Sequence, residues 1–131
     1  MKTPESKIEF KPVKASTRAL GSSYETKVCD LLLLEGWGIL ERNFRTRTGE
    51  IDIIALDGDV LVFIEVKSLR TLSFIDIESL VNQQKQQRIV ETSKYFLSVN
   101  RKYSESIVRY DVVAFCGSEL SLHHIKGAFT E

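Results

Sequence analysis

The stretch GEIDIIALDGDVLVFIEVK, residues 49–67, constrains the fold more than any other part of the chain. It contains two apolar, β-branched runs separated by Asp57-Gly58-Asp59, which is the pattern of a β-hairpin with a tight turn. Charged residues interrupt this pattern near the end away from the turn, at Asp52, Glu65 and Lys67. Charges at the margin of a core need partners, so the hairpin also indicates where a site would lie.

Strand geometry brings these three charges together. Glu65 and Lys67 are two residues apart, so their side chains point to the same face of the sheet. If the turn holds two residues, either Asp57-Gly58 or Gly58-Asp59, Asp52 lies opposite residue 63 or 65 and shares that face. We expect this face to carry Ile54, Leu61 and Phe63 as well, and the other face to carry Ile51, Ile53, Val62, Ile64 and Val66.

Two neighbouring carboxylates are costly to bury unless a cation neutralises them. One interpretation is structural, with Asp52 and Glu65 in a salt-bridged cluster around Lys67. The other is a site for a hard divalent cation, Mg²⁺ or Mn²⁺, because the acids outnumber the lysine and such ions prefer carboxylate oxygens and water. The backbone carbonyl of Val66 would then add a further oxygen ligand.

The elements around the hairpin predict one domain of the α/β class, with a mixed sheet flanked by helices. Residues 1–18 mix charge with two prolines and predict a flexible arm, which leaves residues 19–131 for the domain. We expect further strands at 39–42, at 107–115 in the sheet interior, and through 120–122.

Two helices are expected on this sheet. Helical spacing predicts one over about residues 22–35, where Ser22 and Glu25 fit a capping box, although Glu25 also suits a catalytic site. A loop at 73–78 leads to the second helix, over about residues 83–99 and capped by Asn82. The residues expected to lie on one face of this helix are Gln86, Ile89, Val90, Ser93, Phe96 and Leu97.

Charge and composition limit the setting in which the chain works. The 18 basic and 18 acidic residues cancel, so any contact with nucleic acid must be local. The longest aliphatic run, residues 31–34, is too short to span a bilayer, and charges near the N-terminus argue against a signal peptide. We therefore expect a cytoplasmic protein without membrane contact, in which Cys29 and Cys116 are reduced and partly buried.

Basic residues gather in two places, around Phe44 and in the second helix. Such runs are ordinarily solvated faces. However, a helix N-terminus with cationic side chains also suits a phosphate, which makes both groups possible contacts for a nucleic-acid backbone. The residues proposed for this contact are Gln84, Lys85 and Arg88 on the helix and Arg45 and Arg47 beside Phe44.

Four other polar residues are expected to lie outside the site. Glu50 is predicted to be structural or salt-bridged. Asp111 lies in an apolar strand and could be buried and hydrogen-bonded or support the site from a distance, and a structural role is favoured. His123 and His124 point to opposite faces of a strand, so they do not easily serve one metal.

Glu25, Asp52 and Glu65-Val66-Lys67 together resemble the PD-(D/E)XK nuclease core, which is the core of restriction endonucleases. Within that superfamily the chain resembles the YraN family of small bacterial proteins related to Holliday junction resolvases. The resemblance covers about residues 18–129. It also rests on the segments Gly49–Ala55, Phe63–Lys67, Val81–Arg88, Tyr110–Phe115 and Ile125–Phe129, whereas Ser68–Arg70 and Asn82–Gln84 depart from the family pattern.

The resemblance implies a metal-dependent endonuclease that cuts DNA, including branched or junction DNA in repair and recombination, and leaves 5′-phosphate and 3′-hydroxyl ends. Asp52 and Glu65 would hold Mg²⁺ or Mn²⁺, with Glu25 acting directly or through water, and Lys67 would orient and help deprotonate the attacking water. A homodimer would provide a site for each strand. The alternative is a non-catalytic module that keeps the fold and binds nucleic acid or protein.

Overall fold

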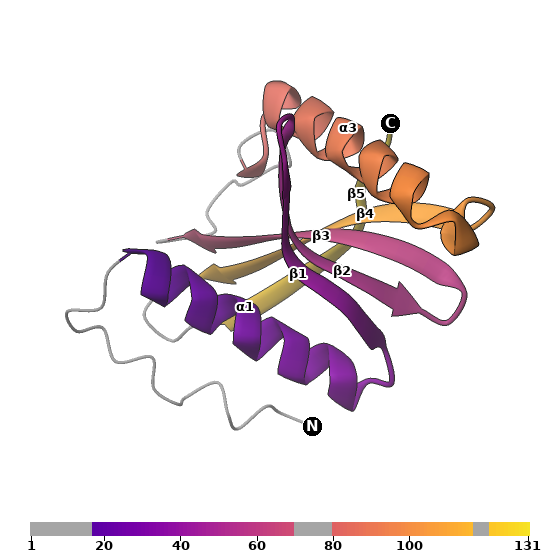
Figure 1. Cartoon of the computed structure of the whole chain (residues 1–131). Coiled ribbons are helices and arrows are strands. Elements are labelled where there is room, and N and C mark those ends of the chain that lie inside the picture. Colours follow the sequence, from indigo (N-terminus) through magenta and orange to yellow (C-terminus); the bar gives the residue numbers. More distant parts are fainter. Residues whose placement is uncertain (1–16, 70–79, 117–120) are drawn as a thin grey trace.

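The structure is a computed structural model that describes residues 17–69, 80–116 and 121–131. The predicted arm, apart from its last two residues, lies outside these ranges, as does the predicted loop at 73–78. The described elements, drawn in Figure 1, are α1 (Thr17–Leu34), β1 (Gly38–Thr46), β2 (Gly49–Asp57), β3 (Val60–Leu69), α3 (Gln83–Val99), the 3-10 helix η2 (Arg101–Tyr103), β4 (Ile107–Cys116) and β5 (Ser121–Phe129).

The strands form one five-stranded sheet in the order β1-β2-β3-β4-β5. Neighbouring strands are antiparallel except β3 and β4, which are parallel, and α3 lies in the connection between these two. This confirms the predicted mixed sheet flanked by helices, with 107–115 in its interior. Strands β1 and β5 are longer than predicted.

The two helices cover opposite faces of the sheet, so the protein has two hydrophobic clusters (Figure 1). Beneath α3 the buried residues include Ile54, Leu61, Phe63, Ile89 and Phe96. Beneath α1 they include Val28, Leu32, Trp37, Ile53, Val62, Ile64 and Phe115. Because β2 and β3 contribute side chains to both clusters, their near-continuous apolar sequence is explained by burial on both faces.

The start of α1 differs from its prediction. The helix begins at Thr17, so Ser22 and Glu25 lie inside it and cannot form a capping box. The prediction for α3 is confirmed, since its cap Asn82 accepts a hydrogen bond at Oδ1 from the backbone N–H of Lys85 at 2.8 Å. Of the face predicted within α3, Ile89, Val90, Ser93 and Phe96 are buried.

Both cysteines, Cys29 and Cys116, are buried, where the sequence predicted partial burial. Over the part of the chain that the structure describes, no helix has the length and apolar character needed to cross a membrane.

Candidate active site

The site lies where β2 separates from β3. The turn between these strands holds two residues, Gly58 and Asp59, and their pairing runs from Asp57–Val60 to Ile53–Ile64. Asp52 and Glu65 are therefore the first residues beyond the last pair. The Oδ2 of Asp52 accepts a hydrogen bond from the backbone N–H of Val66 at 2.8 Å. The carboxylate thus occupies the place of a backbone acceptor on β2.

The separation of the strands also changes which face Ile51 occupies. Beyond Asp52, β2 continues to pair with β1 alone, as in the pair Phe44–Ile51. The side chain of Ile51 packs in the cluster beneath α3, together with Ile54. The prediction that Ile51 shares the opposite face with Ile53 is wrong, because the β1–β2 ribbon turns away from the sheet toward α3 and brings Ile51 into the cluster on that side (Figure 1).

Glu65 is buried, with only 7% of its side chain exposed, and its ion pair comes from α3. Lys85 Nζ lies 3.3 Å from Glu65 Oε2. The salt bridge interpreted from the sequence as involving Lys67 is thus made by Lys85, while Lys67 is near enough for its charge to lower the pKa of Glu65. Lys85 was predicted as a phosphate contact, and its position beside Glu65 places it at the acidic site itself.

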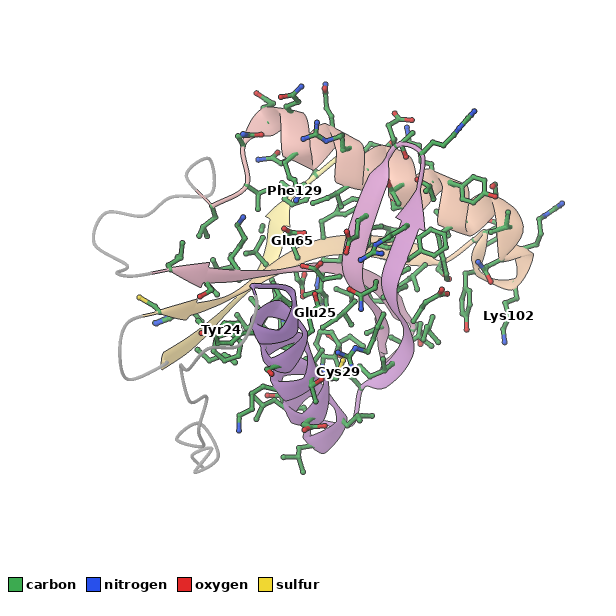
Figure 2. All side chains as sticks on the ribbon, turned by 60° about the vertical axis from the view of Figure 1, so that its left-hand side comes forward. Tyr24, Glu25, Cys29, Glu65, Lys102 and Phe129 are labelled. Atoms are coloured by element: carbon green, nitrogen blue, oxygen red, sulfur yellow. The ribbon has the colours of Figure 1, made fainter. Side chains whose placement is uncertain are left out.

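Glu25 reaches the same region from α1 (Figure 2). Its side chain is 12% exposed, and its Oε1 lies 3.9 Å from Arg42 Nη2, which is too far for a hydrogen bond. This Oε1 is buried and has no hydrogen-bond partner among the described residues. Arg42 itself donates from Nη2 to Thr26 Oγ1 at 3.0 Å.

The three carboxyl groups disfavour each other's ionisation. Burial, and next the charge of Asp52, raises the pKa of both Glu25 and Glu65 from 4.5 to about 7. Burial also raises the pKa of Asp52, although its hydrogen bond from Val66 acts in the opposite direction. The cations Arg42, Lys67 and Lys85 therefore compensate this acidic group incompletely.

A divalent cation such as Mg²⁺ needs oxygen donors, which the carboxylates of this site can supply. Over residues 17–69, 80–116 and 121–131, no three His, Cys, Asp or Glu side chains form a group able to hold a metal ion by themselves. Mg²⁺ usually keeps several waters and takes only one or two carboxylates, so Asp52 and Glu65 meet this requirement. Incompletely compensated, buried carboxylates and the unpartnered Oε1 of Glu25 fit such an ion.

The backbone of Val66 fits the same donor set. Because the N–H and C=O of one strand residue point to the same side, the Val66 carbonyl faces the side on which Asp52 lies. Val66 lies beyond the last pair of β3 with β2, which is Ile53–Ile64. Two carboxylates and a carbonyl are therefore directed to the point where the strands separate.

The tip of the β1–β2 hairpin is fastened to α3. Thr48 Oγ1 and Thr92 Oγ1 are 2.9 Å apart in a hydrogen bond, and Thr48 also bonds Thr46. Gly49 packs so closely that a Cβ there would lie 3.2 Å from Thr92 Oγ1 and 3.4 Å from Arg88 Cβ. In Figure 1 this hairpin rises from the sheet to α3.

The docked tip brings the predicted nucleic-acid contacts into one region. Arg47 in the tip and Gln84 and Arg88 on α3 are exposed. Arg45 is also exposed, but its Nε lies 3.4 Å from Glu50 Oε1, so part of its charge is already compensated. This ion pair confirms the salt-bridged role predicted for Glu50.

Asp111 lies outside this site, as predicted, and is fully buried. It accepts hydrogen bonds from Arg109 Nε at 2.9 Å and from the backbone N–H of Gly127 at 3.0 Å, and it bonds His124 Nε2 at 2.8 Å. Burial alone would raise its pKa, but these hydrogen bonds hold the pKa below its ordinary value. His123 is exposed at the surface.

A groove of about 780 Å³ lies elsewhere, between α3 and the C-terminal end of the chain. Its lining includes Gln83, Gln86, Lys94 and Glu131, and none of the acidic residues described above. The acidic site is thus a partly buried cluster at the sheet rather than part of this groove.

Two residues of the site were missed as partners of the acids. Sequence patterns could not pair Lys85 with Glu65, because residues 70–79 intervene and only the packing of α3 brings the two together. Arg42 lies two residues before Phe44 in the basic run, and its position follows a bulge in β1 between Ile39 and Glu41 that a local sequence pattern does not reveal.

Comparisons with known proteins agree on one family. The model of the Uncharacterised protein family UPF0102 matches residues 24–115. A UPF0102 protein of Treponema denticola is 44% identical over 123 residues, covering 85% of this chain and 95% of that protein. One of Thermodesulfovibrio yellowstonii is 44% identical over 110 residues, with 84% and 95% covered, and one of Francisella tularensis is 38% identical over 114 residues, with 86% and 96% covered. The chain therefore belongs to the UPF0102 family, which confirms its YraN-like resemblance at the level of the family.

Proposed function

We propose that this protein is a metal-dependent endonuclease that hydrolyses DNA phosphodiester bonds, built on a restriction-endonuclease-like PD-(D/E)XK core. The observation that carries the proposal is the meeting of Glu25, Asp52 and Glu65 where β2 leaves β3. Figure 2 shows Glu25 on α1 and Glu65 on β3. Buried carboxyl groups with raised pKa values and incomplete charge compensation are typical of functional sites. Branched or junction DNA in the cytoplasm is the proposed substrate class.

In this proposal Asp52 and Glu65 hold Mg²⁺ or Mn²⁺, assisted by the Val66 carbonyl and by Glu25, directly or through water. The bound ion supplies charge neutralisation at the phosphate and a lowered pKa for its water. Lys67 orients the attacking water. The amine of Lys67 can accept a hydrogen bond from this water only when the amine is neutral, so attack by the water depends on the charge state of Lys67. Arg42, on β1, stabilises the charge of Glu25.

The substrate backbone is proposed to cross the docked hairpin tip and the start of α3. Arg47 and Arg88 are exposed there, and Gln84 offers an amide near the N-terminus of the helix. Because Arg45 is paired with Glu50, it is the weakest of these proposed contacts. Phosphate contacts of this kind position a substrate without reading its sequence.

A second candidate is a non-catalytic module that binds nucleic acid or protein. It is favoured by the ion pair of Lys85 with Glu65, which compensates an acid without any metal, and by the lack of a three-side-chain metal group over the described residues. The two candidates differ in one measurable property, since only the enzyme requires a divalent cation.

Asp52→Asn separates these candidates. Asparagine keeps an oxygen that can accept the hydrogen bond from Val66 but removes the charge, so the fold is retained. We expect the wild type to cleave at least one of a junction, flap, nicked or single-stranded DNA in Mg²⁺ or Mn²⁺, and to melt at a higher temperature when either ion is added. Asp52→Asn should lose both properties.

The matched control is Asp59→Asn, which makes the same change at an exposed acid in the β2–β3 turn, at the other end of the hairpin, and should behave as the wild type. If the wild type shows neither metal-dependent melting nor cleavage of any of these DNAs, the enzyme is ruled out and the binding module remains.

A further inference from the structure

The ion pair between Lys85 and Glu65 joins two side chains of very different accessibility. Lys85 Nζ is 3.3 Å from Glu65 Oε2, yet the lysine side chain is 39% exposed and the glutamate only 7%. A group arriving from solvent can therefore reach the ammonium group without entering the buried site. Glu65, in contrast, can exchange partners only within the site.

The backbone of Lys85 is held by the helix cap. Its N–H donates to the cap residue Asn82, in the first turn of α3. The flexible four-carbon stem of lysine allows the ammonium group to move without movement of the helix. Lys85 can thus leave Glu65 at little cost to the fold around it.

Charge decides when this movement is favourable. Without a metal, Lys85 is the cation that pairs with Glu65. A divalent cation held by Asp52 and Glu65 would place two positive charges near this ammonium group and repel it. The cation would also neutralise Glu65, so Lys85 would no longer be needed as its counter-ion. A phosphate of the substrate, next to the same site, would offer the displaced lysine a new partner of opposite charge.

We propose that Lys85 is an exchangeable counter-ion, which holds Glu65 in the metal-free protein and transfers to a substrate phosphate when the divalent cation binds. This inference rests on the proposed function and gives its site a form of regulation. Metal and DNA then bind cooperatively through one side chain, and each ligand strengthens the binding of the other by the same factor. The charge on the lysine, not its packing, is the property that matters.

The first test measures Mn²⁺ affinity without DNA, by electron paramagnetic resonance at mildly alkaline pH, where proton competition is small. In Lys85→Met the competing cation is lost, so we expect Mn²⁺ to bind about tenfold more tightly than in the wild type, a coupling of ordinary size. Lys85→Arg keeps the charge and should bind Mn²⁺ as the wild type does. The matched control is Lys94→Met on the same helix. Lys94 pairs with Glu131, so this substitution should leave the Mn²⁺ affinity unchanged.

The second test measures binding of a short branched DNA with and without Ca²⁺, used as a divalent ion that supports little cleavage. Ca²⁺ should strengthen DNA binding by the wild type and by Lys85→Arg, and this gain should be lost in Lys85→Met. Circular dichroism of each variant checks that α3 is folded.

The outcomes separate this inference from the proposed function. If the wild type binds Mn²⁺, Asp52→Asn does not, and Lys85→Met binds no more tightly than the wild type, the counter-ion role is overturned while the metal site stands. If neither the wild type nor Asp52→Asn binds Mn²⁺, the proposed function fails and the counter-ion role fails with it.

Discussion

At the scale of single residues, Asp52 performs a task that a strand partner performs elsewhere in the sheet. Its carboxylate accepts the hydrogen bond of the Val66 N–H, a group left over where β2 turns away. It also raises the pKa of Glu25 and Glu65 on either side of it. One side chain thus links the backbone of β3 to the electrostatics of the site.

The raised pKa of Glu65 predicts how stability depends on pH. The folded protein holds this proton up to about pH 7, whereas an unperturbed glutamate releases it near 4.5. Between these values the native state binds more protons than the unfolded state, so the free energy of unfolding falls as pH rises. The stabilisation from this group is complete below 4.5 and is lost above about 7.

Urea unfolding of the wild type and Glu65→Gln across this window, with a chelator present, measures the effect. A rise from 4.5 to about 7 corresponds to up to about 3 kcal/mol. We expect Glu65→Gln to lose less stability than the wild type between acid and mildly alkaline pH, by a value within this limit. Parallel pH profiles for the two proteins would contradict the raised pKa.

At the scale of elements, the β1–β2 hairpin reaches across from the sheet to α3. The hydrogen bond between Thr48 and Thr92 and the close approach of Gly49 fasten it there. The proposed contacts Arg47 and Arg88 come from these two elements, so their spacing depends on this junction.

Gly49→Ala tests the junction. The backbone at Gly49 has a φ of +157°, which L-residues rarely adopt, and an added Cβ would lie 3.2 Å from Thr92 Oγ1. We expect a loss of about 1–3 kcal/mol in the free energy of unfolding. Gly38→Ala is the control, since nothing lies within 4 Å of a Cβ there. Equal stability of both variants would show that the tip is not tightly docked.

At the scale of the whole molecule, 18 basic and 18 acidic residues give no net charge. Attraction of DNA by the overall field is therefore weak, and binding depends on the local cations at the hairpin tip and α3. Salt dependence reports how many phosphates these cations contact.

Arg88→Ala tests this local surface. The substitution keeps the Cβ that packs near Gly49 but removes the charge, so binding of DNA should weaken and the slope of log affinity against log salt should become shallower by about 1. Arg101→Ala in η2 is the control, because its exposed charge lies beyond the other end of α3. Unchanged binding and slope in Arg88→Ala would remove this residue from the contact surface.

Local patterns predicted the elements and the meeting of Asp52 with Glu65, because hairpin register depends on a short turn and on alternation. The cap at Asn82 and the buried face of α3 were predictable for the same reason. The start of α1 at Thr17 was not, since the residues before Ser22 show no amphipathic spacing.

Features that depend on tertiary contacts were not predictable. The place of Ile51 depends on β2 leaving β3. The partner of Glu65 is Lys85, which lies on α3, beyond residues 70–79 of the chain. Asp111 was predicted to be structural, but its bonds to His124 and Gly127 depend on the pairing of β4 with β5.

The parallel pairing of β3 with β4 has a consequence for the order of folding. Val60 pairs with Ile107 across a long connection, whereas β1, β2 and β3 form a local meander. Contacts close in sequence form faster. We therefore expect the acids of β2 and β3 to meet early and the cation of α3 to arrive late, so that φ-values should be higher in the β2–β3 hairpin than in α3.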